Sequence, residues 1–179
     1  MPPYYSKQAL LISNFLDLPT VCGVPLLPLR ASSTARSGPC PIHPDSDFTD
    51  IISESLEFFR FNALVLKSRF DLKSGPDKIL MLITLWVHQC LRELDYAANE
   101  LKSHEEVVEF LLALPRADFL TKTQFLFSKP FSKKDQVLFR EYIEELQTET
   151  CHRLAQVVWN DSCLNKYWTQ YGQINIISI

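Results

Sequence analysis

The stretch Lys78–Leu94 narrows the possible folds of this chain more than any other part of it. Eleven of the sixteen positions from Ile79 to Leu94 are apolar, and one row of them steps by four, three, four and four residues. Such spacing is typical of a helix and not of a strand. A second apolar row lies beside the first, and a helix that is apolar around most of its circumference usually forms the centre of a domain. Ser74 and Asp77 have the residue types and spacing of a helix N-cap, so we predict a buried central helix.

The same stretch is not expected to insert into a membrane. A spanning helix needs about 20 mostly apolar residues, whereas this run is shorter and carries His88, Arg92 and Glu93 near its end. His88 has no metal-binding neighbour in the helix, and lone titratable residues of this kind are usually structural. We therefore interpret His88 as a partly buried core or interface residue rather than a ligand or an acid–base group.

The composition is that of an ordinary globular protein. The chain has 179 residues, of which 46% are hydrophobic and 22% are charged, and its net charge is −3. This length suffices to bury a substantial core, so we predict a single helical domain over residues 1–179. The charge lacks the basic excess of most nucleic-acid-binding proteins, so no nucleic-acid partner is expected. Five irregularly spaced cysteines, and an N-terminus without the features of a signal peptide, favour reduced thiols in the cytoplasm.

Residues 1–46 are predicted to form an extended, proline-rich N-terminal segment that packs on the helical body. Eight of the eleven prolines lie there, and each fixes its own φ and restricts the residue before it. Within the segment, Leu10–Leu18 has the pattern of a short turn of helix, and Ala31–Gly38 has the composition of a loop. The run Val24–Arg30 is apolar and is expected to lie extended along the helices.

Two helices are predicted on either side of the central one in the sequence. The first begins near Asp47 or Thr49, either of which suits a cap, and continues to Phe70, because apolar residues recur there every three or four positions. The second begins after Ser103, which opens a capping-box pattern, and stops before the next proline. After it, the short apolar run Gln124–Phe127 is consistent with either a short strand or an extended packing segment.

The longest helix is predicted to begin after Ser132, which has the type and spacing of an N-cap. Its core row runs from Phe139 to Val157 in steps of three and four residues. Acidic residues crowd its middle, among them Glu144 and Glu145, and we interpret them as a solvated face. The predicted fold class is therefore all-α, with a central buried helix surrounded by about four others.

No constellation of catalytic or metal-binding residues stands out. The four glycines are scattered, so the sequence has no phosphate-binding loop. Cys40 and His43 have a plausible gap, but no second pair follows at zinc-finger spacing. The neighbours Cys151 and His152 point about 100° apart on a helix, which is poor geometry for a nucleophile pair. We therefore expect no cofactor, no metal and no enzymatic activity, and keep a small helical enzyme with an unrecognised site as an alternative.

Aromatic residues gather near the C-terminus, where a last short helix is predicted from Leu164 to Tyr171. Tyr167, Trp168 and Tyr171 share this helix, and two interpretations of them remain open. They either bury against the helical body or form an interface, because Tyr and Trp concentrate binding energy at hot spots. Trp159 is predicted to belong to the core.

Short segments along nearly the whole chain match one family in order and approximate spacing. The matching pieces are Met1-Pro2-Pro3-Tyr4, Leu26-Leu27-Pro28-Leu29-Arg30, Thr49-Asp50-Ile51-Ile52, Phe58-Phe59-Arg60-Phe61-Asn62-Ala63, Ile83-Thr84-Leu85, Cys90-Leu91, Ser128-Lys129-Pro130, Tyr142-Ile143, Leu146, Glu149-Thr150, Arg153-Leu154 and Lys166-Tyr167-Trp168-Thr169. In this ordered run the chain resembles the 21-kDa subunit, subunit 3, of the actin-related protein 2/3 complex. No single piece is diagnostic, but the order is specific.

The resemblance implies an all-helical fold and a non-catalytic role. Members of this family belong to a heteroheptamer that nucleates a daughter actin filament on the side of a mother filament, so a place in the cytoplasmic actin cytoskeleton is implied. The subunit packs mainly on the actin-related protein 3 subunit, which makes that subunit, the other subunits and the actin filament at the branch the expected partners. The residues expected at an interface are Leu29, Arg30, Tyr167, Trp168 and Tyr171.

The chain departs from the family pattern in three places. It has extra residues around Phe15–Val21, it lacks a Pro/Gly-rich run in Arg116–Phe127, and its C-terminus from Gln170 is apolar where the family is basic. Contacts that the family makes through these segments are therefore not carried over. From the residues alone, a stand-alone helical adaptor is a further alternative.

Overall fold

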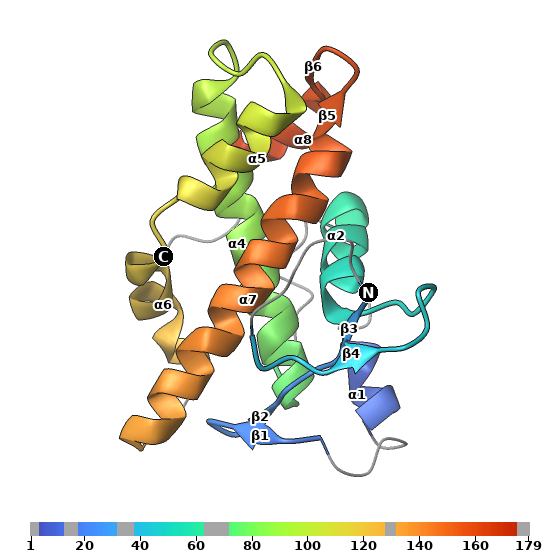
Figure 1. The fold of residues 1–179 in the computed structure, drawn as a ribbon, viewed down its shortest axis with the longest axis vertical. Coiled ribbons are helices and arrows are strands. Elements are labelled where there is room, and N and C mark those ends of the chain that lie inside the picture. The colour runs from blue at the N-terminus through green and yellow to red at the C-terminus, as the bar shows by residue number, and fades with distance from the viewer. Residues whose placement is uncertain (1–3, 13–17, 32–37, 63–71, 128–131, 175–179) are drawn as a thin grey trace.

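The protein is predominantly helical (Figure 1). The computed structural model describes residues 4–12, 18–31, 38–62, 72–127 and 132–174. Helix α4 (Gly75–Ala97) runs through the middle of the molecule and contacts both α2 (Ile51–Asn62) and α7 (Lys133–Val158). In the view of Figure 1, α5 (His104–Ala113) and α6 (Ala117–Thr123) lie on the side away from α2.

Helix α4 contains the predicted central stretch and extends beyond it at both ends. Fifteen of its 23 residues are buried, which is why so much of its circumference is apolar. The predicted capping box forms, since Ser74 Oγ accepts a hydrogen bond from the N–H of Asp77, and the Asp77 carboxylate accepts one from the N–H of Ser74 at 2.7 Å. Trp86 has no exposed surface and packs edge-on against Phe119, with ring centroids 5.1 Å apart.

Helix α2 begins slightly later than predicted. Its cap is Asp50, whose Oδ1 accepts a hydrogen bond from the N–H of Ser53 at 2.9 Å, rather than Asp47 or Thr49. Asp50 caps the helix because its carboxylate is also bound by the guanidinium of Arg153 and by the backbone N–H of Arg30, which fix it at this position. The predicted continuation to Phe70 lies outside the described residues.

Helix α5 is capped as predicted by Ser103, whose Oγ accepts a hydrogen bond from the N–H of Glu106. The next segment differs from the prediction. Gln124–Leu126 forms a 3₁₀ helix, η2, that continues α6, so both the strand and the extended alternative are wrong for these residues, and only Phe127 is extended. This arrangement buries Leu126 and Phe127 against the core, an outcome that a short apolar run does not reveal by its periodicity.

Helix α7 begins after its predicted cap Ser132, but its middle is far more buried than predicted. Glu145 is 8% exposed because its Oε2 accepts the N–H of Cys40 at 2.8 Å, so the interpretation of a wholly solvated acidic face is wrong. Glu144 does remain exposed. At the other end of the helix, Val157 is exposed and Val158 takes its place in the core.

The N-terminal segment wraps α4 and α7 with short elements rather than being wholly irregular. They are helix α1 (Gln8–Ile12), the antiparallel pair β1 (Thr20–Val21) and β2 (Val24–Pro25), and the parallel pair β3 (Leu29–Arg30) and β4 (Ile42–His43). The predicted turn Leu10–Leu18 is present only as the end of α1, and residues 13–17 lie outside the described residues. The hydroxyl of Tyr142 donates to Pro25 O and accepts from the N–H of Leu27, each at 3.2 Å, which holds the extended run on α7.

The C-terminal region closes one end of the molecule. It consists of the hairpin β5 (Trp159–Asn160) and β6 (Cys163–Leu164), helix α8 (Lys166–Thr169) and the 3₁₀ helix η3 (Gln170–Gln173). Leu164 therefore lies in a strand before the predicted helix. Gly172 packs directly on α4, where a Cβ would come within 2.6 Å of Leu91 O. Only glycine permits this close approach.

Candidate functional site

One face of α2 presents a row of partly or fully exposed side chains beside α7. Ser53, Leu56 and Arg60 are spaced by three or four residues, so they line up along the helix. Near the start of the row, Ser53 contacts Arg153 of α7, and at its end Arg60 shares a hollow with Val157 of α7. We call this the α2–α7 surface; it consists of Arg30, Ser53, Leu56, Arg60, Val157 and Tyr167.

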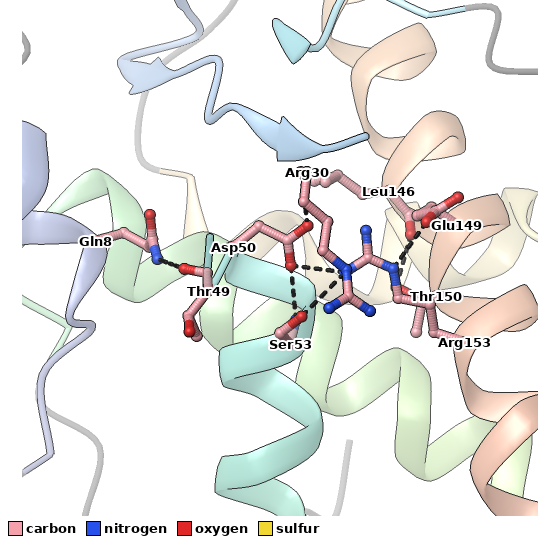
Figure 2. Close-up of polar contacts among 9 residues, drawn as sticks. All are labelled: Gln8, Arg30, Thr49, Asp50, Ser53, Leu146, Glu149, Thr150 and Arg153. Carbon is pink, nitrogen blue, oxygen red and sulfur yellow. Dashed lines mark hydrogen bonds and ion pairs between the residues drawn. The ribbon is translucent and has the colours of Figure 1, made fainter. Parts of the chain in front are cut away.

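A buried ion-pair network lies beneath one end of this surface (Figure 2). Arg153 Nη1 donates to Asp50 Oδ1 at 2.8 Å and to Ser53 Oγ at 3.1 Å, and Arg153 Nε donates to Glu149 Oε1 at 2.7 Å. The three charged side chains are each 6% exposed or less. The second oxygen of Asp50 accepts the N–H of Arg30 at 3.0 Å. The network therefore fixes strand β3 to the start of α2.

Burial and hydrogen bonding act in opposite directions on these groups. Removal from water by itself raises the pKa of Asp50, but the hydrogen bonds and charge of Arg153, with two backbone N–H donors, hold that pKa below its usual value. For Arg153, burial lowers the pKa, while the bonds to Asp50 and Glu149 outweigh burial and raise it. Both partners therefore stay ionised, and each depends on the other to be tolerated in the interior.

A further contact ties the N-terminal segment to the same place. The Nε2 of Gln8 donates to the carbonyl oxygen of Thr49 at 2.7 Å, directly before the cap of α2 (Figure 2). Gln8 is itself buried. Gln8, Arg30 and Arg153, which lie far apart in the sequence, thus all bind residues at the start of α2.

The interface candidates from the N-terminal segment separate in the structure. The side chain of Leu29 has no exposed surface, so within this chain it belongs to the core. Arg30 is half-buried and borders the ion-pair network. Of this pair, only Arg30 reaches the surface where a partner protein can contact it.

The C-terminal candidates lie together at the other end of α2. Trp168 is 7% exposed and stacks on Phe59, with ring centroids 6.3 Å apart, so it closes the core of this chain. Tyr167 is 44% exposed, and its hydroxyl donates to Arg60 O at 3.0 Å. Tyr171 is half-buried and meets the Tyr167 ring edge-on at 5.6 Å.

Sequence reasoning did not single out Asp50, Glu149 or Arg153 as a cluster. Glu149 and Arg153 are four residues apart on a helix, a spacing that favours an ion pair and was available as a signal. Asp50 is separated from Arg153 by 103 residues, and no local pattern joins them. Through the backbone N–H of Arg30, the network fixes the position of strand β3 beside α2.

Other titratable groups are engaged in the structure. Burial lowers the pKa of His88, whose Nε2 lies 2.8 Å from Ile174 O, in keeping with its interpretation as a structural residue. Burial raises the pKa of the Cys90 thiol. In the described ranges, the cysteines are free thiols, and no group of three or more metal-ligating side chains comes together. No helix within these ranges is long and apolar enough to cross a bilayer.

Comparisons with known proteins agree along the whole chain. The family model described as P21-Arc, the ARP2/3 complex ARPC3 (21 kDa) subunit, matches residues 1–177. The Actin-related protein 2/3 complex subunit 3 of Arabidopsis thaliana is 31% identical over 175 residues, which cover 93% of this chain and 96% of that protein. The proteins of the same name from Dictyostelium discoideum and Schizosaccharomyces pombe are 30% and 26% identical, covering 86% and 97% of this chain and 86% and 95% of their own lengths.

Proposed function

This chain belongs to the family of the 21-kDa subunit, subunit 3, of the actin-related protein 2/3 complex, and we propose that it packs on the actin-related protein 3 subunit through the α2–α7 surface. Its role is that of a non-catalytic subunit of the complex. In this proposal the remaining subunits and the actin filament at the branch are its further partners. Its place is the cytoplasmic actin cytoskeleton, where the complex nucleates branched filaments.

The observation that carries the proposal is the placement of Arg30 and Tyr167. They are 137 positions apart in the sequence. The backbone N–H of Arg30 is bound by Asp50, directly before α2, and the hydroxyl of Tyr167 is bound by the carbonyl of Arg60 in the last turn of α2. A helix of twelve residues is about 18 Å long. One side of a standard protein interface buries about 800 Å² and roughly 20–30 residues, so this row would form part of such an interface and the partner would extend beyond it.

The chemistry of the α2–α7 surface also supports a partner. Arg and Tyr are enriched at the centres of interfaces, and aliphatic side chains such as Leu56 and Val157 add apolar area between them. The buried network below binds the backbone N–H of Arg30, so the main chain that carries this side chain is already fixed before a partner arrives.

The test is reconstitution of the complex with a double variant, Arg30→Gln with Tyr167→Ala. A matched control carries Arg140→Gln with Tyr96→Ala, which change the same residue types at exposed positions outside the α2–α7 surface. Both isolated chains are expected to melt close to the parent, and only the first is expected to co-purify poorly with the actin-related protein 3 subunit. Equal recovery of the two variants would refute the proposed surface.

Size-exclusion chromatography of a native lysate tests the place of the chain in the complex separately. A complex subunit elutes far above 20.7 kDa, whereas a stand-alone adaptor elutes near its own mass. Elution of the whole pool near the monomer mass would therefore argue against the assignment to the complex.

A further inference from the structure

The end of the α2–α7 surface near Tyr167 contains an open hollow of about 440 Å³. Five residues from the ends of α2 and α7 and from the start of α8 line it: Arg60, Val157, Asn165, Tyr167 and Trp168. The volume falls within the roughly 300–1,000 Å³ of typical small-ligand sites, so there is room for one or two side chains of a partner.

The walls of the hollow are held in place by contacts within the chain. Trp168 forms part of the wall and is stacked on Phe59 in the core, with the two rings inclined by only 11°. Tyr167 is fixed at its hydroxyl by Arg60 O and at its N–H by Asn165 Oδ1, which lies 2.9 Å away. A rigid hollow of this kind loses little conformational entropy when it is filled.

Three exposed apolar side chains lie in or beside the hollow. Phe61, Val157 and Tyr167 are 69%, 39% and 44% exposed, and they are three of the nine large hydrophobic side chains that are exposed in the described part of the chain. Phe61 adjoins the hollow through the guanidinium of Arg60, which lies 5.3 Å from the centre of its ring. Exposed apolar groups that gather in one place, rather than being scattered, mark interaction sites.

The charge of the hollow has one sign. Arg60 is the single charged residue among the five that line it. Glu57, one helical turn before Arg60, is bound to Lys7 at 3.3 Å. Within the described residues, therefore, Arg60 offers a cation beside the side chains of Val157 and Tyr167, and a guanidinium binds a carboxylate through two parallel hydrogen bonds.

We propose that this hollow receives a segment of the neighbouring subunit in which an Asp or Glu adjoins an aliphatic or aromatic residue. The carboxylate pairs with Arg60, and the apolar side chain fills the space between Val157, Tyr167 and Trp168. This inference rests on the proposed function, because it assumes that the α2–α7 surface meets another subunit.

Site-specific cross-linking in the assembled complex identifies the occupant. The photoreactive residue benzoylphenylalanine replaces Val157, and a second preparation carries it at Tyr96 as a control outside the α2–α7 surface. After irradiation, mass spectrometry is expected to find Val157 joined to a partner peptide in which an acidic residue lies within two positions of an apolar one. A peptide without acidic residues, or the absence of any cross-link to a partner, would overturn the proposal.

Charge variants test the role of Arg60 itself. Arg60→Gln is expected to weaken incorporation into the complex about tenfold or more, as loss of an interface hot spot does, and Arg60→Lys less, because lysine keeps the charge but not the paired geometry. Arg92→Gln on α4 is the matched control, since Arg92 is exposed and its recorded ion pair is with its neighbour Glu93.

Failure of this inference is distinguishable from failure of the proposed function. If the double variant at Arg30 and Tyr167 incorporates poorly but Arg60→Gln incorporates like Arg92→Gln, the surface stands and the occupant is wrong. If both incorporate normally, the α2–α7 surface is not an interface. A charge-reversed Arg60→Glu chain that is rescued by a lysine at the cross-linked acidic position would establish the pair directly.

Discussion

Replacing Arg153 with methionine removes the cation of the buried network while keeping the aliphatic length of the side chain. Asp50 and Glu149 then remain in the interior, 0% and 3% exposed, without the cation of Arg153. Asp50 keeps two backbone N–H donors, at 2.9 and 3.0 Å, which offset part of the loss. Breaking a buried ion pair by removing one partner costs about 3–5 kcal/mol, which corresponds to roughly 6–20 °C in melting temperature for a chain of this size.

The loss of stability in Arg153→Met is expected to depend on pH. In the parent, the pKa of Asp50 is held low, so its contribution to the free energy of unfolding is present above the unfolded pKa of about 3.9 and does not change between pH 7 and pH 5. In Arg153→Met, burial acts on Asp50 without the opposing cation and raises its pKa. Protonation then relieves the buried charge, so the deficit of the variant is expected to shrink as the pH falls from 7 to 5.

Urea unfolding of the isolated chain at pH 7 and pH 5 measures both effects. Arg92→Met is the matched control and is expected to change the free energy of unfolding by less than about 0.5 kcal/mol, because Arg92 is exposed. A triple variant with Asp50→Asn and Glu149→Gln added to Arg153→Met is expected to recover most of the loss, since all three buried charges of the network are then removed together. An Arg153→Met chain that melts within a degree or two of the parent, or whose deficit is the same at both pH values, would refute the argument.

Three further predictions concern the C-terminal end and the thiols. Trp168→Ala is expected to lower the free energy of unfolding of the isolated chain by about 3–5 kcal/mol, as for other buried aromatic residues, whereas Tyr167→Ala changes it much less; similar melting of both would place Trp168 outside the core. Burial lowers the pKa of His88 in the folded state, so the folded protein binds a proton there less readily than the unfolded chain, whose pKa is about 6.5. The free energy of unfolding is therefore expected to fall as the pH drops through about 6.5, and to fall less in His88→Gln. With a thiol reagent on the native protein, Cys163 is expected to react quickly and Cys90 only after unfolding, and quick labelling of Cys90 would contradict its burial.

The features predicted correctly from the sequence are those set by local interactions. Ser74, Ser103 and Ser132 each cap a helix by accepting a hydrogen bond from the backbone N–H three residues later. Such a cap involves residues of a single turn, so it can be recognised in the sequence. The helical spacing of the stretch around Trp86 likewise depends only on neighbours along the chain. The family was recognisable because many such short pieces occur in one order.

The features that were missed depend on contacts between distant residues. Glu145 is charged and lies among other acidic residues, so it is read as solvated, but the N–H of Cys40 is 105 residues away and binds it in the interior. Leu29 and Arg30 are neighbours in an extended run, and only the packing of β3 decides that the first is buried and the second reaches the surface. The hollow beside Arg60 is assembled from the ends of three helices and has no signature in any one of them.

The binding of the N-terminal segment to α7 has a consequence for how the chain folds during synthesis. Leu27, Cys40 and Asp50 find their partners 115, 105 and 103 residues later. At about 5–20 residues per second, α7 is completed roughly 5–26 s after those N-terminal residues are made. During that interval the apolar run before β3 can contact α4 but lacks its packing on α7, and contacts of such long sequence separation also form slowly. The nascent chain is therefore a substrate for chaperones until its last third has been translated, and ribosomal pausing before α7 is expected to reduce the yield of folded protein more than pausing after it.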